Sequence, residues 1–351
     1  MKAWQVRSHG GLEALETVDL PEPKPGPMQV KVRVQAVGLN HLDIWVRKGV
    51  PGHKFPLPMV PGCDIAGQIV EFGPGSESAL KNSGLVVGSD VILNPGNSCG
   101  HCEACLSGLD PLCREYGMPG ETQDGGCAEF FIARVANLIA RPKNLSASQA
   151  ASLPIPFITA WSMLVRKAQV KPGEVVLIQA GGSGVSIAAI QIAKLFGSIV
   201  ITTVGSDEKI AKAQALGADH VINYRKERFR EALKKILPAY GKKGCDIVID
   251  HVGADTMNES IKSLTWGGRL ATCGATSGAD VTLDLKAIFF KNISIFGTTM
   301  GSKADFIRIV DLVAQGKLKP VVDSELPMSD LRKAHERVES RAIFGKVVVT
   351  Q

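Results

Sequence analysis

The chain has 351 residues, 45% of them hydrophobic, which is enough to bury the cores of two domains. Its formal charge of +6 is spread without a dense block of lysine and arginine, so the composition argues against nucleic-acid binding. Residues 1–7 contain no apolar signal region, and no stretch approaches the ~20 apolar residues of a membrane helix. We therefore expect a soluble cytoplasmic protein, in which eight cysteines indicate metal binding, catalysis or packing rather than disulfides.

The first ~150 residues are rich in strand and turn signals. Residues 30–37 alternate as a half-buried strand does, after a proline-rich approach. Glycines then divide the chain into short segments, at positions 62, 67, 73, 75, 84 and 88. This pattern favours a small irregular barrel over a sandwich.

Beyond a mostly helical stretch at 150–167, strand and helix signals alternate. Strands are predicted at 175–178, 198–204, 221–222, 246–250, 269–273 and 293–296, and helices at 185–196, 207–216 and 228–237. Apolar strands that alternate with helices predict an α/β fold with a parallel sheet covered on both faces. The last ~50 residues leave this rhythm, and we expect them to return to the first domain.

Four cysteines with short spacings form the strongest local motif, Cys99-x2-Cys102-x2-Cys105-x7-Cys113. Four thiolates close a tetrahedral shell around zinc and leave no open position for a substrate, so the motif predicts a structural zinc. An iron–sulfur cluster uses similar ligands, and four unrelated loop cysteines are the remaining alternative. His101 is expected to be a surface residue, because four sulfurs suffice.

A glycine-rich turn joins the strand at 175–178 to the next helix. In the dinucleotide fingerprint G-x-G-x-x-G, Gly181 takes the first place, Ser183 the second and Ser186 the third. Small residues let a pyrophosphate approach the backbone, and the helix N-terminus supplies free N–H groups. We predict cofactor contacts here from Gly181, Gly182, Ser183, Gly184 and Val185, against the alternative of an ordinary strand-to-helix turn.

The end of the next strand favours NADP(H) over NAD(H). NAD enzymes usually place a carboxylate there for the ribose hydroxyl, whereas residues 202–206 have none, and Asp207 and Glu208 fit the start of a helix. A 2′-phosphate has candidate partners in Ser206, Lys209 and Tyr224, with Arg225 beside them, although each is equally an ordinary surface residue. Further contacts with the cofactor are predicted for Gly253, Gly274 and Lys346.

Taken together, these features resemble the medium-chain dehydrogenase/reductase superfamily, which includes zinc alcohol dehydrogenases and quinone oxidoreductases. The resemblance covers essentially the whole chain and includes Gly62-x4-Gly67-x5-Gly73, the cysteine motif, Thr159-Ala160-Trp161 and Gly345-Lys346-Val347-Val348. It implies a GroES-like catalytic domain formed by residues 1–156 and 297–351, with the zinc lobe at about 94–117. A Rossmann domain would occupy residues 157–296.

The usual catalytic-zinc ligands of the alcohol dehydrogenases are replaced. Their places hold Asn40, Cys63 and Ile155, and the acid of the signature is Asp64. Catalytic zinc needs three protein ligands and an open position, so we expect none here. An irregular site made by Cys63, Asp64 and His41 is the alternative.

Residues 38–43 instead resemble the G-x-N-x-x-D stretch of quinone oxidoreductases, although Trp45 stands where many of them carry tyrosine. The resemblance implies hydride transfer from NADPH to a quinone or an activated C=C bond without catalytic zinc. Candidate catalytic residues are Asn40 as a hydrogen-bond donor, His41 as a proton relay, and Asp43, Cys63, Asp64 and Thr159.

Two other functions stay open: a zinc-dependent alcohol or aldehyde oxidoreductase with a variant metal site, and a nucleotide-binding protein with little activity. The expected partner is a small-molecule substrate. In relatives the last Rossmann strand often pairs across a dimer, which implies a homodimer or homotetramer through residues 293–297.

Overall fold

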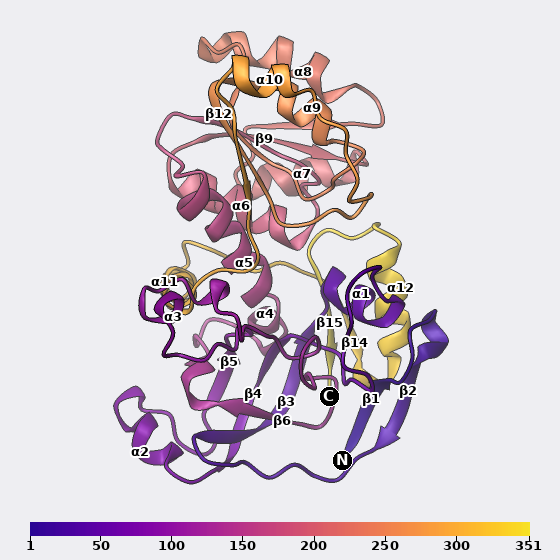
Figure 1. Cartoon of the computed structure of the whole chain (residues 1–351), viewed down its shortest axis with the longest axis vertical. Helices are drawn as coiled ribbons and strands as arrows, with labels where there is room; N and C mark the ends of the chain where they lie inside the picture. The colour runs from indigo at the N-terminus through magenta and orange to yellow at the C-terminus, as the bar shows by residue number, and fades with distance from the viewer. The chain divides into compact units, whose positions relative to one another are not determined.

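The computed structural model describes all 351 residues, and the chain divides into two compact units. The first contains Met1–Ile155, Ser302–Gly316 and Pro320–Gln351, and the second contains Pro156–Gly301 and Lys317–Lys319 (Figure 1). Both ends of the chain therefore belong to one unit. No helix combines the length and the apolar character that crossing a lipid bilayer requires.

A mostly antiparallel sheet built around one long strand organises the first unit, and only β14 and β15 pair in parallel. The strand order is β14-β15-β3-β4-β5-β7, with β6 also paired to β3, while β1 and β2 form a separate hairpin. The predicted strand at 30–37 lies within β3. The strands are β1 (Lys2–Val6), β2 (Leu15–Asp19), β3 (Gln29–Gly38), β4 (Asp64–Phe72), β5 (Asp90–Leu93), β6 (Phe130–Arg134), β7 (Leu138–Ala140), β14 (Val322–Pro327) and β15 (Lys346–Thr350).

Short helices join these strands. They are α1 (His41–Lys48), α2 (Ser76–Leu80), α3 (Glu103–Leu106), α4 (Ala147–Ala151), α11 (Lys303–Ala314) and α12 (Leu331–Glu339), with single 3-10 turns η1 (Leu12–Ala14), η2 (Lys81–Ser83), η3 (Asp110–Leu112), η4 (Val135–Asn137) and η7 (Met328–Asp330). The core consists of the inward side chains of β3, β4 and β15, such as Val32, Ile65 and Val347. This packing brings the C-terminal strand β15 against β3 of the first third of the chain.

The second unit is a six-stranded parallel sheet in the order β10-β9-β8-β11-β12-β13. The strands are β8 (Val175–Ile178), β9 (Ile199–Val204), β10 (His220–Asn223), β11 (Cys245–Ile249), β12 (Leu264–Thr272) and β13 (Ser294–Gly297). The order reverses between β8 and β11, and ligands of such folds bind at the carboxyl ends of the strands beside this point. The predicted parallel sheet is confirmed.

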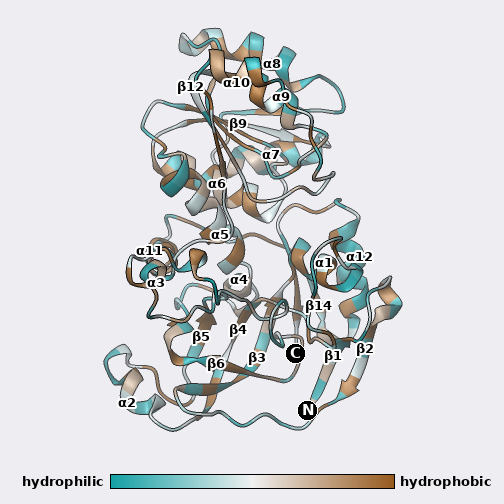
Figure 2. Ribbon diagram, viewed as in Figure 1, coloured by the Kyte–Doolittle hydropathy of each residue, from teal (hydrophilic) through white to brown (hydrophobic).

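Helices accompany this sheet, and Figure 2 shows its strands as mostly hydrophobic, whereas hydrophilic residues gather on the helices. The helices are α5 (Pro154–Trp161), which continues as the π-helix η5 (Ser162–Lys167), α6 (Gly184–Leu195), α7 (Glu208–Ala215), α8 (Phe229–Ile236), η6 (Leu237–Tyr240), α9 (Met257–Lys262) and α10 (Leu285–Phe290). Strand β12 begins at Leu264, five residues before the predicted start of this strand at position 269. Exposed Trp266 and Gly267, whose φ is +69°, interrupt the apolar pattern there.

A buried histidine in the first unit makes stability depend on pH. His335 of α12 is fully buried, and neither ring nitrogen has a partner. Burial, together with the neighbouring Arg47 guanidinium, lowers the pKa of His335 to about 3, and Glu339 acts in the opposite direction. Because an unfolded histidine keeps a pKa near 6.5, unfolding takes up a proton between these two values. Stability gained from the neutral ring is therefore lost as the pH falls below about 6.5.

We predict that His335→Leu flattens the acid side of the stability profile. Each unit of acidification below pH ~6.5 costs wild type about 1.4 kcal/mol through this residue, and the variant lacks that loss. Urea unfolding at pH 7.5 and 5.5 measures the difference. Replacement of the exposed His53 by leucine is the control and should retain the wild-type slope. An unchanged slope in His335→Leu contradicts the prediction.

Candidate functional site

The four predicted zinc ligands come together in the first unit. Their sulfurs all lie within 4.8 Å of one another, with Cys99 Sγ 3.9 Å and Cys102 Sγ 3.6 Å from Cys105 Sγ. Zn–S bonds of about 2.3 Å give a tetrahedron with S–S edges of about 3.8 Å, so the cluster has the dimensions of a zinc shell.

Several groups prepare this cluster for a cation. Hydrogen bonds from Ser98 and from the backbone of Gly100 help to lower the pKa of Cys105 to about 6, which favours a thiolate at neutral pH. The N–H of Cys102 donates to Cys99 Sγ over 3.3 Å. His101 is exposed and its Nδ1 lies 3.0 Å from the Cys99 carbonyl oxygen. The residues fit a structural zinc held by four cysteines, with no open position.

Asp43 anchors the start of α1 rather than facing outward. Its Oδ2 accepts the Asn40 N–H over 2.7 Å and its Oδ1 accepts the Gly62 N–H over 2.9 Å. Gly62 has φ +103°, and a Cβ there would lie 2.8 Å from Val37 Cγ1, so only glycine fits. Burial raises the pKa of Asp43 to about 6. The two bonds use both carboxylate oxygens, and the predicted catalytic role of Asp43 stays a prediction.

A buried ion pair joins Asp64 at the start of β4 to Lys346 at the start of β15. Lys346 Nζ lies 3.2 Å from Asp64 Oδ2, 2.7 Å from Asn40 Oδ1 and 2.5 Å from the Leu39 carbonyl oxygen, so all three ammonium hydrogens have acceptors. The other Asp64 oxygen accepts the N–H of Ile155 over 2.9 Å. Burial raises the pKa of Asp64, and the Lys346 charge opposes that shift.

The same pair fixes the amide of Asn40. Nδ2 donates to Asp64 Oδ2 over 3.0 Å and to the Gly38 carbonyl oxygen over 3.3 Å, while Oδ1 accepts from Lys346. Both amide hydrogens are thus directed within the protein. His41, the first residue of α1, is half-buried and packs edge-on against Trp45 with ring centroids 5.9 Å apart.

The positions of the usual catalytic-zinc ligands do not form a three-ligand set. Cys63 is fully buried, and burial raises the pKa of its thiol far above the ordinary value. Ile155 offers no side-chain donor, Asn40 is held as described, and a cationic ammonium lies beside Asp64. Groups of three metal-binding side chains occur in the chain only around the cysteine cluster. These residues do not fit a catalytic zinc of the usual kind.

The glycine-rich turn in the second unit has the geometry of a phosphate cradle. The Gly181 N–H donates to the Thr203 carbonyl over 2.7 Å, and a Cβ on Gly181 would lie 2.4 Å from Thr202 Oγ1. Ser183 is the N-cap of α6 and accepts the Ser186 N–H over 3.2 Å. Gly182 lies within the turn, and Gly184 and Val185 begin the helix, whose first N–H groups lack helical acceptors. The residues present fit a dinucleotide pyrophosphate.

The residues expected near a 2′-phosphate follow β9 and β10. The Tyr224 N–H donates to the Val204 carbonyl over 3.1 Å, and the Tyr224 hydroxyl lies close to Gly205. Ser206 and Lys209 are partly exposed beyond the tip of β9. Asp207 is bound by Asn223 Nδ2 at 2.7 Å and by Lys226, so its carboxylate already has two partners. The sequence carries no local signal for these contacts of Asn223 and Lys226.

The remaining predicted cofactor and catalytic residues are Gly253, Gly274, Thr159 and Lys346. Gly253 has φ +96°, and a Cβ there would meet the Gly278 carbonyl oxygen at 2.5 Å, so loop packing alone explains this glycine. Gly274 follows β12, and Thr159 is buried in α5. Lys346 has all its donors engaged in the first unit, and its predicted contact with the cofactor stays a prediction.

Two domains of known proteins match the two units of this chain. Residues 26–143 match the alcohol dehydrogenase GroES-like domain and residues 184–315 match the zinc-binding dehydrogenase family. Quinone oxidoreductase from Homo sapiens is 30% identical over 99% of this chain and 97% of its own length. An NAD-dependent alcohol dehydrogenase from Sulfolobus acidocaldarius is 31% identical over 99% of both.

The chain belongs to the medium-chain dehydrogenase/reductase family. A solved structure described as an NAD-dependent alcohol dehydrogenase is 47% identical, covers 100% of both chains and superposes with a TM-score of 0.94. The protein is therefore an oxidoreductase with a GroES-like domain and a Rossmann-type parallel sheet.

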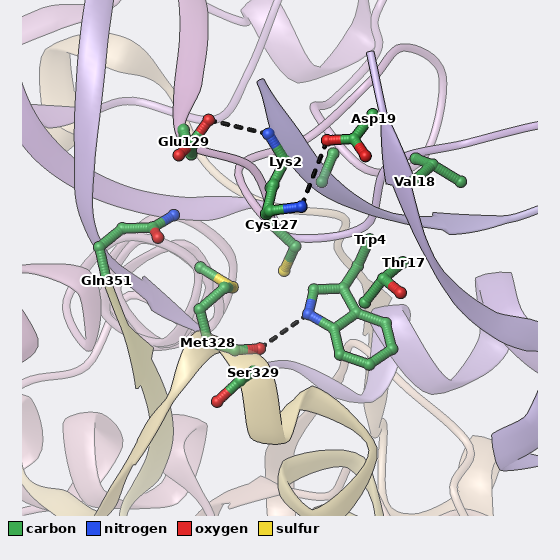
Figure 3. A pocket seen from close by; sticks show the side chains of 11 residues that line it. Lys2, Trp4, Thr17, Val18, Asp19, Cys127, Glu129, Met328, Ser329 and Gln351 are labelled. Carbon is green, nitrogen blue, oxygen red and sulfur yellow. Dashed lines mark hydrogen bonds and ion pairs between the residues drawn. The ribbon is translucent and has the colours of Figure 1, made fainter.

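A cavity of about 290 Å³ lies at the β1–β2 hairpin, and none of the predicted site residues lines it. Figure 3 shows its lining, in which Trp4 Nε1 donates to the Met328 carbonyl over 2.7 Å and Lys2 pairs with Asp19. The indole bond ties the hairpin to the C-terminal part of the same unit. Nothing in this lining resembles the chemistry of a catalytic site.

We predict that Cys113→Ser releases the metal of the cysteine cluster. Serine is a poor zinc ligand, and a shell with three sulfurs opens to water, so zinc per chain should fall from about one toward none. Plasma emission spectrometry after gel filtration measures the ratio. Cys273→Ser in the second unit is the matched control and should retain its zinc. Full zinc content in Cys113→Ser would show that the cluster is not the metal site.

Proposed function

We propose that the enzyme transfers hydride from NADPH to a quinone, an enal or enone, or a related carbonyl compound, without a catalytic zinc. The observation that carries this proposal is the Asp64–Lys346–Asn40 network, which places an ammonium group among the positions where zinc ligands would be needed. The relationship to quinone oxidoreductases supports the same substrates.

In this mechanism the nicotinamide supplies the hydride when bound. The Lys346–Asp64 pair holds Asn40 and the start of α1 in place, so that the adjacent His41 is presented at a fixed position. We assign to His41 the proton that balances hydride addition, because imidazole exchanges protons near neutral pH. Asp43 contributes by anchoring the same helix to Gly62.

A second function has its own support. The relatives named NAD-dependent alcohol dehydrogenase include the solved structure with 47% identity, and Cys63 and Asp64 are both metal-binding residue types. A zinc-dependent alcohol dehydrogenase with a variant metal site is therefore the alternative. It requires the Lys346 ammonium to leave Asp64, because a divalent cation and an ammonium repel each other there.

For the cofactor we propose NADP(H) in preference to NAD(H). Asp207, the acid nearest the tip of β9, is paired with Lys226, and Tyr224 and Arg225 are exposed on the segment that follows β10. This arrangement presents positive charge where a 2′-phosphate would bind. One zinc in the cysteine cluster completes the proposed cofactors.

We also propose that the enzyme works in the cytoplasm. All eight cysteines are free thiols, and the cluster needs reduced sulfurs to hold zinc. A reducing compartment preserves both.

The free edge of the parallel sheet supports a homodimer. β13 pairs only with β12, so its outer edge leaves backbone donors and acceptors unpaired. Large apolar side chains are exposed on β13 and nearby elements of the second unit: Trp266, Leu285, Phe289, Phe290 and Ile295. We propose that a second copy of the chain pairs along β13 and covers these residues.

Rates measured with a panel of enals, quinones and alcohols are expected to distinguish the two functions. With NADPH, the enzyme should reduce enals or quinones faster than it oxidises alcohols, and kcat/KM should be higher with NADPH than with NADH. Addition of a chelator that leaves the cluster zinc bound should not change the rate. Alcohol oxidation as the main activity, lost on chelation while the protein stays folded, would favour the zinc-dependent alternative.

The dimer is expected to dissociate in Ile295→Lys. A charged side chain on the edge strand opposes strand pairing. Sedimentation velocity should give twice the chain mass for wild type and one chain mass for the variant. Leu106→Lys, an exposed leucine of the first unit, is the control and should stay dimeric. A monomeric wild type at micromolar concentration would rule the dimer out.

A further inference from the structure

A buried histidine lies against the glycine-rich turn and takes part in none of the functions above. His251 follows the carboxyl end of β11 and is 9% exposed. Its Nε2 lies 2.8 Å from Ser186 Oγ and 3.1 Å from Ser183 Oγ. The imidazole therefore contacts the N-cap residue of α6 and the hydroxyl one turn further into the helix.

The number of hydrogens on the Ser186 hydroxyl and the His251 ring determines which atom donates in their contact. The single hydroxyl hydrogen of Ser186 goes to the Gln179 carbonyl oxygen over 2.7 Å, because a carbonyl only accepts. The 2.8 Å contact is then a hydrogen bond only if His251 donates it, which is the tautomer with the ring hydrogen on Nε2. Ser183 Oγ already accepts the Ser186 N–H, and it also lies within hydrogen-bond distance of His251 Nε2, at 3.1 Å.

The surroundings of His251 keep its ring neutral. Burial lowers the pKa of His251, and the Asp250 carboxylate acts in the opposite direction. Asp250 already accepts hydrogen bonds from Val252, Gly253, Thr256 and Ser260, over 2.6–3.3 Å. Cys273, which follows β12, is a thiol because burial raises its pKa to about 12. The groups that contact the ring from α6 are the uncharged Ser183 and Ser186.

One hydrogen in this group remains available. The Ser183 hydroxyl hydrogen points at Ser186 Oγ over 3.0 Å, and it is the only hydroxyl hydrogen of the pair without a carbonyl acceptor. It lies at the N-terminus of a 12-residue helix, where free N–H groups and the helix dipole favour an anion. A phosphate oxygen would accept this hydrogen as a charge-assisted bond.

We propose that His251 is a positioning residue for the dinucleotide: its Nε2–H holds Ser186 and Ser183 so that the Ser183 hydroxyl donates to a pyrophosphate oxygen. This inference rests on the proposed function, because it takes the turn to be the dinucleotide site. It adds a histidine that lies 65 residues from Ser186 in the sequence and touches the cofactor only through serine.

A pair of substitutions separates the hydrogen bond from simple packing. Glutamine can place an amide N–H near the position of Nε2, whereas leucine fills the space without a donor. In a titration of NADPH fluorescence, His251→Leu should weaken binding about tenfold, the scale of one charge-assisted hydrogen bond, and His251→Gln should regain most of the loss. His220→Gln, at the start of β10 and bonded to Tyr240 over 2.7 Å, is the matched control and should bind as wild type.

A double-variant cycle tests whether His251 acts through Ser183. Ser183→Ala should weaken binding by a similar factor, and adding His251→Leu to it should cause little further loss. If the two losses of affinity multiply, as independent effects do, His251 does not act through Ser183 and the proposal is overturned.

The tautomer of His251 gives a second test. The 15N spectrum of histidine-labelled protein without cofactor should show His251 as the neutral Nε2–H tautomer, and an Nδ1–H tautomer would also overturn the proposal.

The outcomes distinguish this inference from the proposed function. If wild type binds neither NADPH nor NADH, both fail. If wild type binds and His251→Leu binds equally tightly, or His251→Gln is as weak as His251→Leu, only the role of His251 fails.

Discussion

The ion pair between Lys346 and Asp64 holds together the segments of the first unit that carry the candidate catalytic residues. It joins the C-terminal strand to β4, and through Asn40 and the Leu39 carbonyl it also holds the segment before α1. A buried charge with one partner removed costs several kcal/mol, so each member requires the other. In the function that we propose, the pair also decides the chemistry, because the ammonium takes up the acceptors that would otherwise face a catalytic cation.

The cysteine cluster and the glycine-rich turn lie in different units of the chain. The cysteine cluster has the size and the electrostatics of a closed zinc shell, which stabilises a loop and offers no position to a substrate. In the second unit, the glycine-rich turn and the start of α6 provide a cradle for a pyrophosphate, with His251 and Ser186 setting the direction of the Ser183 hydroxyl. In the function that we propose, metal binding is structural, and hydride transfer depends on a cofactor and on proton donors of the chain.

The sequence predicted those parts whose residues are close together in the chain. The cysteines fall within fifteen residues, and the turn follows directly from β8, so their spacing carries the geometry. Contacts between residues that are far apart in the sequence could not be predicted from spacing. Lys346 was assigned to the cofactor, yet its three acceptors include a carboxylate 282 residues away. Asn40 was predicted as a donor, whereas both of its amide hydrogens are directed at acceptors that only the folded chain brings near. His251 had no local signal at all.

Anomalous X-ray diffraction from crystals of the enzyme, measured on both sides of the zinc absorption edge, tests the central claim most directly. The account predicts one zinc peak, surrounded by Cys99, Cys102, Cys105 and Cys113, and the Lys346 ammonium on Asp64. A second zinc peak bounded by Cys63 and Asp64, with Lys346 displaced, would contradict it.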